Sequence, residues 1–348
     1  MKSSQEFFRG CLIGGAIGDA LGWPVEFKKY TEIIKQYGPK GISDLQLAST
    51  GKAEITDDTQ MTLFTAEGIL RAQTRFNEKG ICNAPDVVFY AYQRWLYTQG
   101  HSKVMDWEWC YDGWLLSIKE LFHRRSPGTS CLSALISKKH GSITEPVNNS
   151  KGCGGVMRVA PAGLFFGKDD AFDMAIDFAA LTHGHPSGYL SAGAFSYMIA
   201  CIIEGQFLND AVDNTIAKLK IYKDHQECIT ILKLAKSLVI SDISDIKAIT
   251  RLGAGWTGEE ALGIATYCAL KYKDDFEKAI ITAINHDGDS DSTGAITGNI
   301  LGAYLGFENI PERWIEDIEL KDVLIQISDD LLVGYQEGDL WWNRYPGY

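Results

Sequence analysis

Residues 287–306 read DGDSDSTGAITGNILGAYLG, and this stretch decides how the chain folds. Its first part alternates aspartates with small residues. Its second part carries glycines at four-residue intervals, at Gly294, Gly298, Gly302 and Gly306. A glycine inside a helix costs about 1 kcal/mol relative to alanine, so a stripe of four on one helix face needs a reason. We favour close approach of a second helix, and a flexible glycine-rich loop is the alternative.

A matching stripe lies near the N-terminus, where residues 10–22 read GCLIGGAIGDALG with a glycine at every fourth position. Acidic residues adjoin both stripes: Asp19 and Glu26 accompany the first, and the aspartates of 287–291 precede the second. We therefore expect two tightly packed helices that gather acidic groups from distant parts of the chain.

A further acidic cluster, Thr56-Asp57-Asp58-Thr59, opens the apolar helical stretch 57–73. Its simplest interpretation is an N-cap by Thr56 with acids in the first turn, and Ser290 or Ser292 would cap the later helix in the same way. Two adjacent carboxylates are more than a cap requires, however, and they repel each other. Carboxylates and hydroxyls from two such clusters would suit Mg²⁺, Mn²⁺ or Ca²⁺.

Helical periodicity dominates the rest of the chain, and strand-like or hairpin patterns are few. We predict an all-α fold and a single domain over residues 1–348, because no linker divides the chain. The C-terminal residues 339–348 are aromatic and should pack against the body of the protein. The expected helices cover 57–73, 85–97, 112–123, 169–181, 188–204, 209–220, 226–239, 259–272, 275–285, 292–306 and 312–332.

The composition excludes several classes of protein. The 348 residues carry 33 basic and 45 acidic side chains, a net charge of −12, and no Lys/Arg run, which disfavours nucleic acid as a partner. The eight cysteines include no Cys-x-x-Cys pair, and the N-terminus is a poor secretory signal, so we expect a reduced, cytoplasmic protein. No stretch of about 18 apolar residues is apparent, so we expect no membrane span.

Three further segments are candidates for ligand binding. Residues 150–158, SKGCGGVMR, are glycine-rich and can form an anion-binding concavity from backbone N–H groups, or an ordinary loop. The His183-Gly184-His185 spacing lacks the further ligands of a zinc site, so His183 is either structural or a contact for substrate. Trp256, in the glycine-rich loop 253–258, would stack on a planar ligand group or belong to the core.

These segments together resemble the ADP-ribosylglycohydrolase family, which includes dinitrogenase reductase-activating glycohydrolase and the ADP-ribosyl-acceptor hydrolases. The resemblance covers residues 14–294, about four-fifths of the chain. It rests on five segments in the family's order: GGAIGDALG (14–22) with Val25-Glu26-Phe27, TDDT (56–59), GCGGVMR (152–158), GWTGEEAL (255–262) and GDSDSTG (288–294).

The resemblance implies an all-α domain with two Mg²⁺ ions, or Mn²⁺ in their place, in a central cleft. The implied metal ligands are Thr56, Asp57, Asp58, Asp289, Asp291 and Ser292. Glu26 would ligate a metal or contact substrate, and either Glu26 or Asp58 would be the catalytic proton acceptor. The implied substrate-binding residues are Ser150, Lys151, Gly152, Cys153, Gly154, Gly155, Val156, Met157 and His183, and we add Trp256.

The family often has asparagine at the position of Cys153 and threonine at that of Ser292, although serine also occurs in arginine-directed members. We therefore expect hydrolysis of the α-N-glycosidic bond of ADP-ribosyl-arginine proteins. One alternative is an O-linked substrate, either ADP-ribosyl-serine or O-acetyl-ADP-ribose. Another, from a different class, is an immunity protein that binds an ADP-ribosylating toxin without catalysis.

Overall fold

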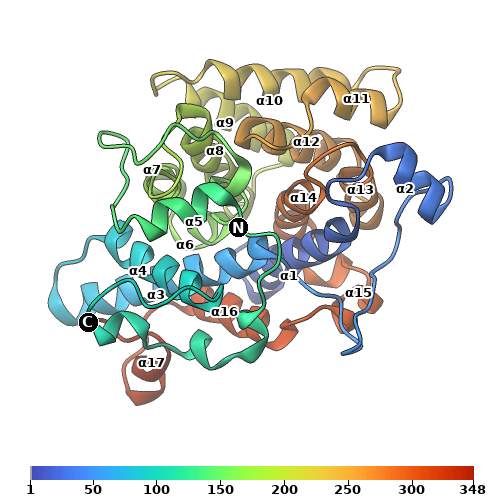
Figure 1. The fold of residues 1–348 in the computed structure, drawn as a ribbon. Coiled ribbons are helices and arrows are strands. Elements are labelled where there is room, and N and C mark those ends of the chain that lie inside the picture. Colours follow the sequence, from blue (N-terminus) through green and yellow to red (C-terminus); the bar gives the residue numbers. More distant parts are fainter. Residues whose placement is uncertain (1) are drawn as a thin grey trace.

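Helices α1 (Gln5–Gly22) and α14 (Ser290–Leu305) lie antiparallel at the centre of the fold (Figure 1). Their glycine stripes face each other in register, with Gly14 against Gly298 and Gly18 against Gly294. A methyl group added at any of these four positions would lie well under 3.0 Å from a backbone oxygen of the other helix. The predicted close packing of the two helices is confirmed, and it is possible only because these positions lack a side chain.

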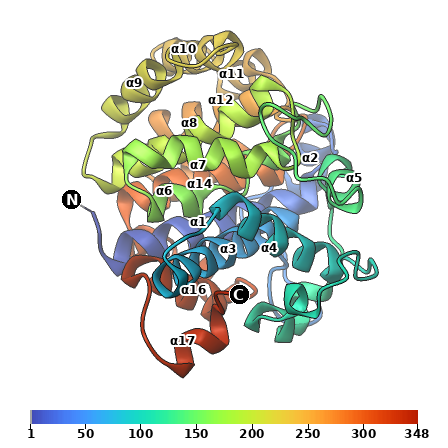
Figure 2. The same cartoon turned by 90° about the vertical axis from the view of Figure 1, so that its left-hand side faces the viewer.

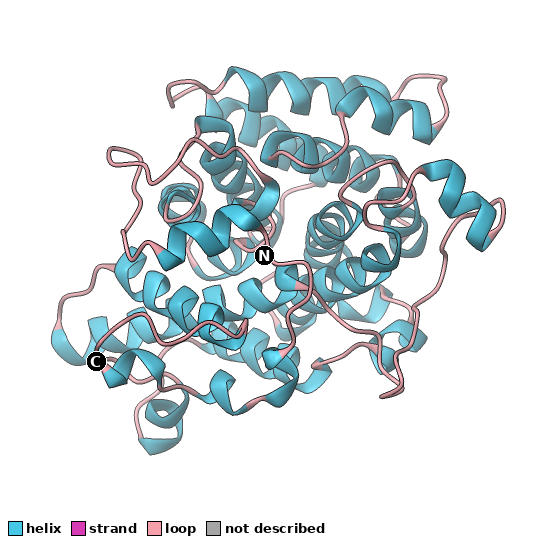
Figure 3. Cartoon of the chain, viewed as in Figure 1, coloured by secondary structure: helices cyan, strands magenta, loops and turns pink. Residues whose placement is uncertain are grey.

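The computed structural model describes residues 2–348, and these form helices without a β-sheet (Figure 3), so the predicted all-α class is confirmed. The remaining α-helices are α2 (Tyr30–Tyr37), α3 (Asp57–Lys79), α4 (Ala84–Thr98), α5 (Thr129–Ile136), α6 (Ala160–Phe165), α7 (Lys168–Ala180), α8 (Pro186–Ile203), α9 (Leu208–Leu219), α10 (Gln226–Val239), α11 (Asp245–Leu252), α12 (Gly258–Lys271), α13 (Phe276–Ile284), α15 (Glu312–Asp317), α16 (Lys321–Val333) and α17 (Asp339–Arg344). Short 3-10 helices are η1 (Trp23–Val25), η2 (Glu108–Tyr111), η3 (Trp114–Ser117), η4 (Lys119–Phe122), η5 (Cys153–Gly155) and η6 (Phe307–Asn309).

One continuous hydrophobic core runs from α1 to the C-terminal helix, as a single domain requires. A smaller cluster of buried side chains lies between α10, α11, α12 and α13. In Figures 1 and 2, α10 and α11 lie at one end of the molecule and α17 lies at the opposite end. The contact between α1 and α14 lies at the centre of the fold and brings residues from the N-terminal and C-terminal parts of the chain together.

The predicted helix over 112–123 is wrong. The chain there makes the short helices η3 and η4, separated by Ile118 in an extended conformation. Gly113 has a φ of 124° and lies against the buried carboxylate of Glu67, a position that a side chain could not occupy. Only Leu115 and Leu121 of this segment are buried hydrophobic residues, so too few apolar contacts remain to hold a full helix face.

The predicted helix over 312–332 is two helices, α15 and α16. Between them the backbone pairs with Ala53: the Ala53 N–H donates to Asp317 O at 2.8 Å, and the Glu319 N–H donates to Ala53 O at 3.0 Å. Leu320 then adopts a left-handed conformation with a φ of 59°. These interactions use backbone groups that a continuous helix would need.

Helices α2, α5, α11 and α17 were not predicted from the sequence. Each has eight residues or fewer, which is too short for a clear periodic pattern and too short to be stable without tertiary contacts.

The expectation that the chain has no stretch of about 18 apolar residues is wrong for helix α8. Its 18 residues are long and apolar enough to cross a membrane by length and composition. In the fold 83% of this segment is buried among other helices, as befits a core helix. The C-terminal residues pack back on the body, as predicted. Trp341 Nε1 donates to Thr74 Oγ1 at 2.9 Å, and the Tyr345 hydroxyl donates to Asp330 Oδ2 at 2.7 Å.

Candidate active site

The first acidic cluster opens α3, and Asp19 of α1 holds it in place. Thr56 is the N-cap: its Oγ1 accepts from the Asp58 N–H at 3.4 Å and donates to Asp19 Oδ1 at 2.8 Å. Asp19 Oδ2 accepts from the Thr56 N–H at 2.9 Å and from the Thr59 hydroxyl at 2.5 Å. Asp57 and Asp58 lie buried in the first turn. The capping interpretation of Thr56 is therefore confirmed, and its hydroxyl keeps a lone pair free for a further partner.

The second cluster opens α14, and its N-cap is Asp289 instead of either serine. Asp289 Oδ1 accepts from the Ser292 N–H at 3.3 Å, and Asp291 Oδ1 accepts from the same group at 3.0 Å. Asp289, Asp291 and Ser292 are all buried. The Ser292 hydroxyl has only long contacts, to Cys153 Sγ at 3.6 Å and Met157 Sδ at 3.9 Å.

The two clusters converge, although more than 200 residues separate them in the sequence. Burial raises the pKa values of Asp57 and Asp58 well above the usual range of an aspartate. The negative charge of Asp291 is the second cause of both shifts. Burial, and then the charge of Asp291, raise the pKa of Glu26 to about 9. Such coupling requires short distances between the carboxyl groups. One site is therefore shared by five acids from three parts of the chain, with Asp19 as a sixth buried acid behind Thr56; the five are Glu26, Asp57, Asp58, Asp289 and Asp291.

This group of acids lacks compensating positive charge, since none of the five forms an ion pair within residues 2–348. Asp58 Oδ1 is buried and has no hydrogen-bond partner in that range. In the same range, no three His, Cys, Asp or Glu side chains lie close enough together to coordinate one metal ion. Carboxylates without compensating charge repel one another, and a bound cation would draw them together. An anionic set of carboxylate and hydroxyl oxygens fits a hard divalent cation.

Glu26 lies at the edge of the acidic site, beside an exposed aromatic pair. Its Oε2 accepts from the Ser126 hydroxyl at 2.7 Å. The next residue, Phe27, has a φ of 64° and is 71% exposed, and its ring stacks on Trp256 with centroids 5.1 Å apart. Trp256 is itself 40% exposed, so it is a surface residue and not a core tryptophan. A non-glycine residue in the left-handed region is strained, and such strain clusters at functional sites.

The glycine-rich loop lies against the second acidic cluster. The Cys153 thiol donates to Asp289 Oδ2 at 2.8 Å, and the Cys153 N–H donates to Trp256 O at 3.2 Å. Burial, and then the charge of Asp289, raise the pKa of this thiol, which keeps it protonated as a donor. Cys153 thus links the loop to both the acidic site and the aromatic pair.

The residues of this loop differ in their access to a ligand. Ser150, Lys151, Gly152 and Cys153 are partly exposed, whereas Gly154, Gly155, Val156 and Met157 are buried. The N–H groups of Gly152 and Cys153 already donate to Ser150 Oγ and Trp256 O. The Lys151 ammonium forms ion pairs with the carboxylates of Glu259, at 2.9 Å, and Glu227, at 3.1 Å. A backbone anion concavity therefore has fewer unused donors here than the sequence suggests.

His183 lies beneath the same loop and is 1% exposed. Its Nδ1 shares a hydrogen bond with Thr182 Oγ1 at 2.8 Å, and a side chain added at Gly154 would clash with its ring. Burial, and then the charge of Arg158, lower its pKa to about 3, so this imidazole is neutral. Its position fits the structural interpretation, as a support for the loop.

The comparisons with known proteins agree with this architecture. The model for the family described as ADP-ribosylglycohydrolase matches residues 1–340. The chain belongs to the ADP-ribosylglycohydrolase family. Its relatives include the ADP-ribosyl-[dinitrogen reductase] glycohydrolase of Rhodospirillum rubrum, 26% identical, with 90% of each chain covered. The ADP-ribosylarginine hydrolase Tri1 of Serratia proteamaculans is 25% identical, with 97% of this chain and 82% of that protein covered.

One further relative and one solved structure extend the comparison. The ADP-ribosylhydrolase ARH3 of Bos taurus is 24% identical, with 92% of this chain and 91% of that protein covered. A solved structure titled ADP-ribosylglycohydrolase-related protein complex shares the fold with a TM-score of 0.63, at 21% identity and over 97% of this chain and 100% of that one. The chain is accordingly a member of a glycohydrolase family whose relatives include a hydrolase named for ADP-ribosylarginine and a glycohydrolase named for ADP-ribosyl-[dinitrogen reductase].

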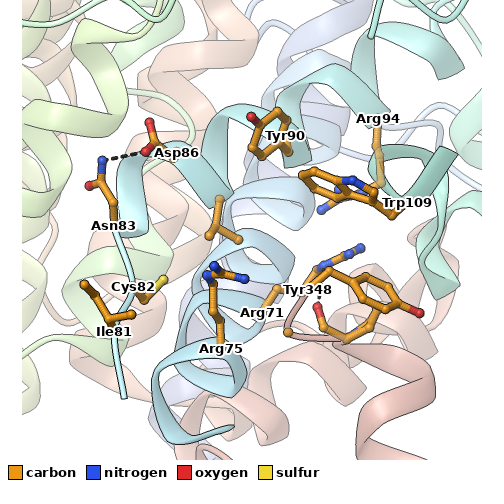
Figure 4. Close-up of a pocket in the computed structure, with 13 residues that line it drawn as sticks. Arg71, Arg75, Ile81, Cys82, Asn83, Asp86, Tyr90, Arg94, Trp109 and Tyr348 are labelled. Atoms are coloured by element: carbon orange, nitrogen blue, oxygen red, sulfur yellow. Dashed lines mark hydrogen bonds between the residues drawn. The ribbon is translucent and has the colours of Figure 1, made fainter. Parts of the chain in front are cut away.

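Three residues of this ADP-ribosylglycohydrolase site were not predicted from the sequence. The roles of Asp19 and Phe27 were not recognised, and Ser126 was not identified as part of the site. An aspartate inside an otherwise apolar helix was the available signal for Asp19. The contact between Ser126 and Glu26 joins segments 100 residues apart and has no local signature. A cavity of about 550 Å³, lined by Arg75 and Trp109 among others, lies elsewhere in the fold (Figure 4), so the chemistry of the donors identifies this site and cavity size does not.

Proposed function

We propose that this ADP-ribosylglycohydrolase removes ADP-ribose from arginine side chains of modified proteins and thereby reverses mono-ADP-ribosylation. The observation that carries the proposal is the buried set of uncompensated acids at the starts of α3 and α14. Water would add to the anomeric carbon of the ribose, the bond from that carbon to the guanidine nitrogen would break, and a proton would pass to the departing nitrogen.

Two Mg²⁺ ions, or Mn²⁺ in their place, would be held by Thr56, Asp57, Asp58, Asp289, Asp291 and Ser292. When bound, such ions stabilise developing charge and lower the pKa of a nearby water. The Asp19 carboxylate orients the Thr56 hydroxyl from behind, and the Cys153 thiol does the same for Asp289.

Between the two candidate proton acceptors, the geometry favours Glu26. Bound cations would lower its raised pKa again, so that the carboxylate could accept a proton. Asp58 is buried, whereas Glu26 is only partly buried and lies at the edge of the site. Its hydrogen bond to Ser126 fixes one carboxylate oxygen and leaves the other to hold or move a proton.

Arginine as the modified residue is supported by the exposed pair of Phe27 and Trp256. A guanidinium group stacks well on aromatic faces, whereas a serine hydroxyl has nothing to stack. Ser292 and the similarity to Tri1 point the same way. Similarity to ARH3 keeps O-linked ADP-ribose as the second candidate. No feature of residues 2–348 favours the toxin-binding alternative.

The decisive experiment compares release of ADP-ribose from arginine-modified and serine-modified proteins by the same preparation. We expect kcat/KM to be higher on the arginine substrate by at least about tenfold. A reversed preference would support the O-linked candidate, and release from neither substrate would contradict the proposal. The variant Trp256→Leu should raise KM for the arginine substrate alone, because only that substrate presents a guanidinium for stacking.

A further inference from the structure

Residues 125–128, which we call the strap, lie between η4 and α5 and cross the start of α3. The Arg125 carbonyl oxygen accepts from the Asp57 N–H at 3.2 Å, and the Gly128 N–H donates to Asp57 Oδ2 at 3.2 Å. Asp57 is thus held both at its backbone and at its carboxylate. Both hydrogen bonds use backbone groups of the strap, so they depend on where the strap lies and not on which side chains it carries.

Ser126 connects the strap to a second acid of the site. Its hydroxyl donates to Glu26 Oε2 at 2.7 Å. Ser126 has a φ of 49° and precedes Pro127. A residue before proline favours an extended backbone, and the left-handed region is unfavourable for serine. The surrounding structure must therefore hold this conformation, and such strain clusters at functional sites.

A buried ion pair anchors the strap. Arg125 and Glu319 are 6% and 7% exposed, and the guanidinium donates to both oxygens of the carboxylate, at 2.5 and 3.2 Å. The same guanidinium donates to Ile55 O at 3.0 Å and to Glu54 Oε1 at 3.1 Å. The Ile55 N–H in turn donates to Glu319 Oε2 at 3.2 Å. The ion pair therefore fixes the strap to the residues immediately before Thr56.

Arg125 also contacts the element that carries Glu26. Its guanidinium lies over the Trp23 ring, 5.7 Å from the centroid. Trp23 is the first residue of η1, and its carbonyl oxygen accepts from the Glu26 N–H at 3.2 Å. One guanidinium thus links the strap, the segment before α3 and η1, and these three carry or contact both acids.

The simpler interpretation is an ion pair that only stabilises a loop. A buried ion pair gains little stability over apolar residues of similar size, because removing two charges from water is costly. Stability alone also does not require the strained backbone at Ser126. We propose that Arg125 and Glu319 are positioning residues, which act through the strap to fix Asp57 and Glu26 relative to each other. This inference rests on the roles of these two acids in the proposed function.

The first test is calorimetric titration of the full-length protein with Mg²⁺, which needs no substrate. Glu319→Gln removes one charge of the ion pair but keeps an oxygen acceptor, and Arg125 retains Glu54 as a partner. We expect this variant to bind Mg²⁺ about tenfold more weakly, because the partners that orient a metal ligand affect its affinity on this scale. The control is Glu316→Gln, an exposed acid of α15 that pairs with Lys321, and it should bind Mg²⁺ as the wild type does.

The second test uses Ser126→Gly, which leaves the ion pair intact and separates positioning from stability. Glycine adopts a φ of 49° without strain, so the melting temperature should be unchanged or higher. The variant should nevertheless lower kcat for release of ADP-ribose by about tenfold, because Glu26 loses the hydrogen bond that orients it. KM should change by less than about twofold. A strap that serves the fold alone would leave kcat unchanged.

Unchanged Mg²⁺ affinity in folded Glu319→Gln would overturn the inference, and so would a wild type that binds no Mg²⁺. If Glu319→Gln does not fold, the kcat of Ser126→Gly decides: a tenfold loss supports the inference and full activity overturns it. A wild type that binds Mg²⁺ but releases no ADP-ribose would contradict the proposed function alone. In that case the Mg²⁺ affinity of Glu319→Gln still decides whether the ion pair positions Asp57.

Discussion

Asp19 is the residue on which the geometry of the first acidic cluster, Thr56 to Thr59, depends. Its carboxylate accepts hydrogen bonds from the backbone and hydroxyl groups of both Thr56 and Thr59. An amide has one acceptor oxygen and cannot serve all four donors, so Asp19→Asn should lower the free energy of unfolding by about 1–3 kcal/mol. Urea denaturation measures this. Asp169→Asn, an exposed acid in the first turn of α7, is the control and should cost at most about 0.5 kcal/mol.

Phe27 combines an unfavourable backbone conformation with an exposed ring, which suggests that it serves function more than stability. The variant Phe27→Asn should leave stability unchanged or raise it by up to about 1 kcal/mol, because asparagine tolerates the left-handed region. The same change should raise KM for ADP-ribosyl-arginine protein. A variant with lower stability and an unaltered KM would show that the ring contributes to packing alone.

At the residue scale, the sequence predicted the acids of the site but not their supports. Thr56, Asp57, Asp58, Asp289, Asp291 and Ser292 stand in short motifs, and the structure brings these together. The contacts of Asp19, Cys153 and Ser126 join segments that are remote in the sequence, and only the tertiary fold determines them.

At the scale of elements, the contact between α1 and α14 sets the distance between the two acidic clusters. Gly298→Ala would place a methyl group against Gly14 O, so the helices must separate. We expect a loss of stability of about 1–3 kcal/mol or more, although alanine is the better helix former. The control is Gly167→Ala, where the added methyl group meets nothing within 4 Å, and it should cost less than about 1 kcal/mol. Thermal denaturation distinguishes the two, and equal effects would contradict the account.

The helices that could be predicted are those with a clear local pattern in the sequence. The glycine stripes of α1 and α14 carry a clear four-residue period, and long periodic segments such as α3 and α8 were found. The breaks at 112–123 and at 318–320 depend on Glu67 and Ala53, which are distant in the sequence. No local pattern could reveal these contacts.

At the scale of the whole molecule, cation binding should be visible as stability. A ligand bound only by the folded state, at about 100 times its Kd, adds about 2.7 kcal/mol. We therefore expect Mg²⁺ or Mn²⁺ to raise the melting temperature of the wild type and to have no effect on Asp291→Asn. Without added metal this variant should be at least as stable as the wild type, because it removes one of several repelling charges. A metal-dependent shift of equal size in both proteins would place the ions elsewhere.

Removal of ADP-ribose should depend on cations held by the acids at the starts of α3 and α14. The most direct measurement is release of free ADP-ribose from ADP-ribosyl-arginine protein by wild type and Asp58→Asn, with EDTA and after addition of excess Mg²⁺. We predict that the wild type is active, loses activity in EDTA and regains it with Mg²⁺, and that folded Asp58→Asn is inactive in every condition. Undiminished release in EDTA, or by Asp58→Asn, would contradict the claim.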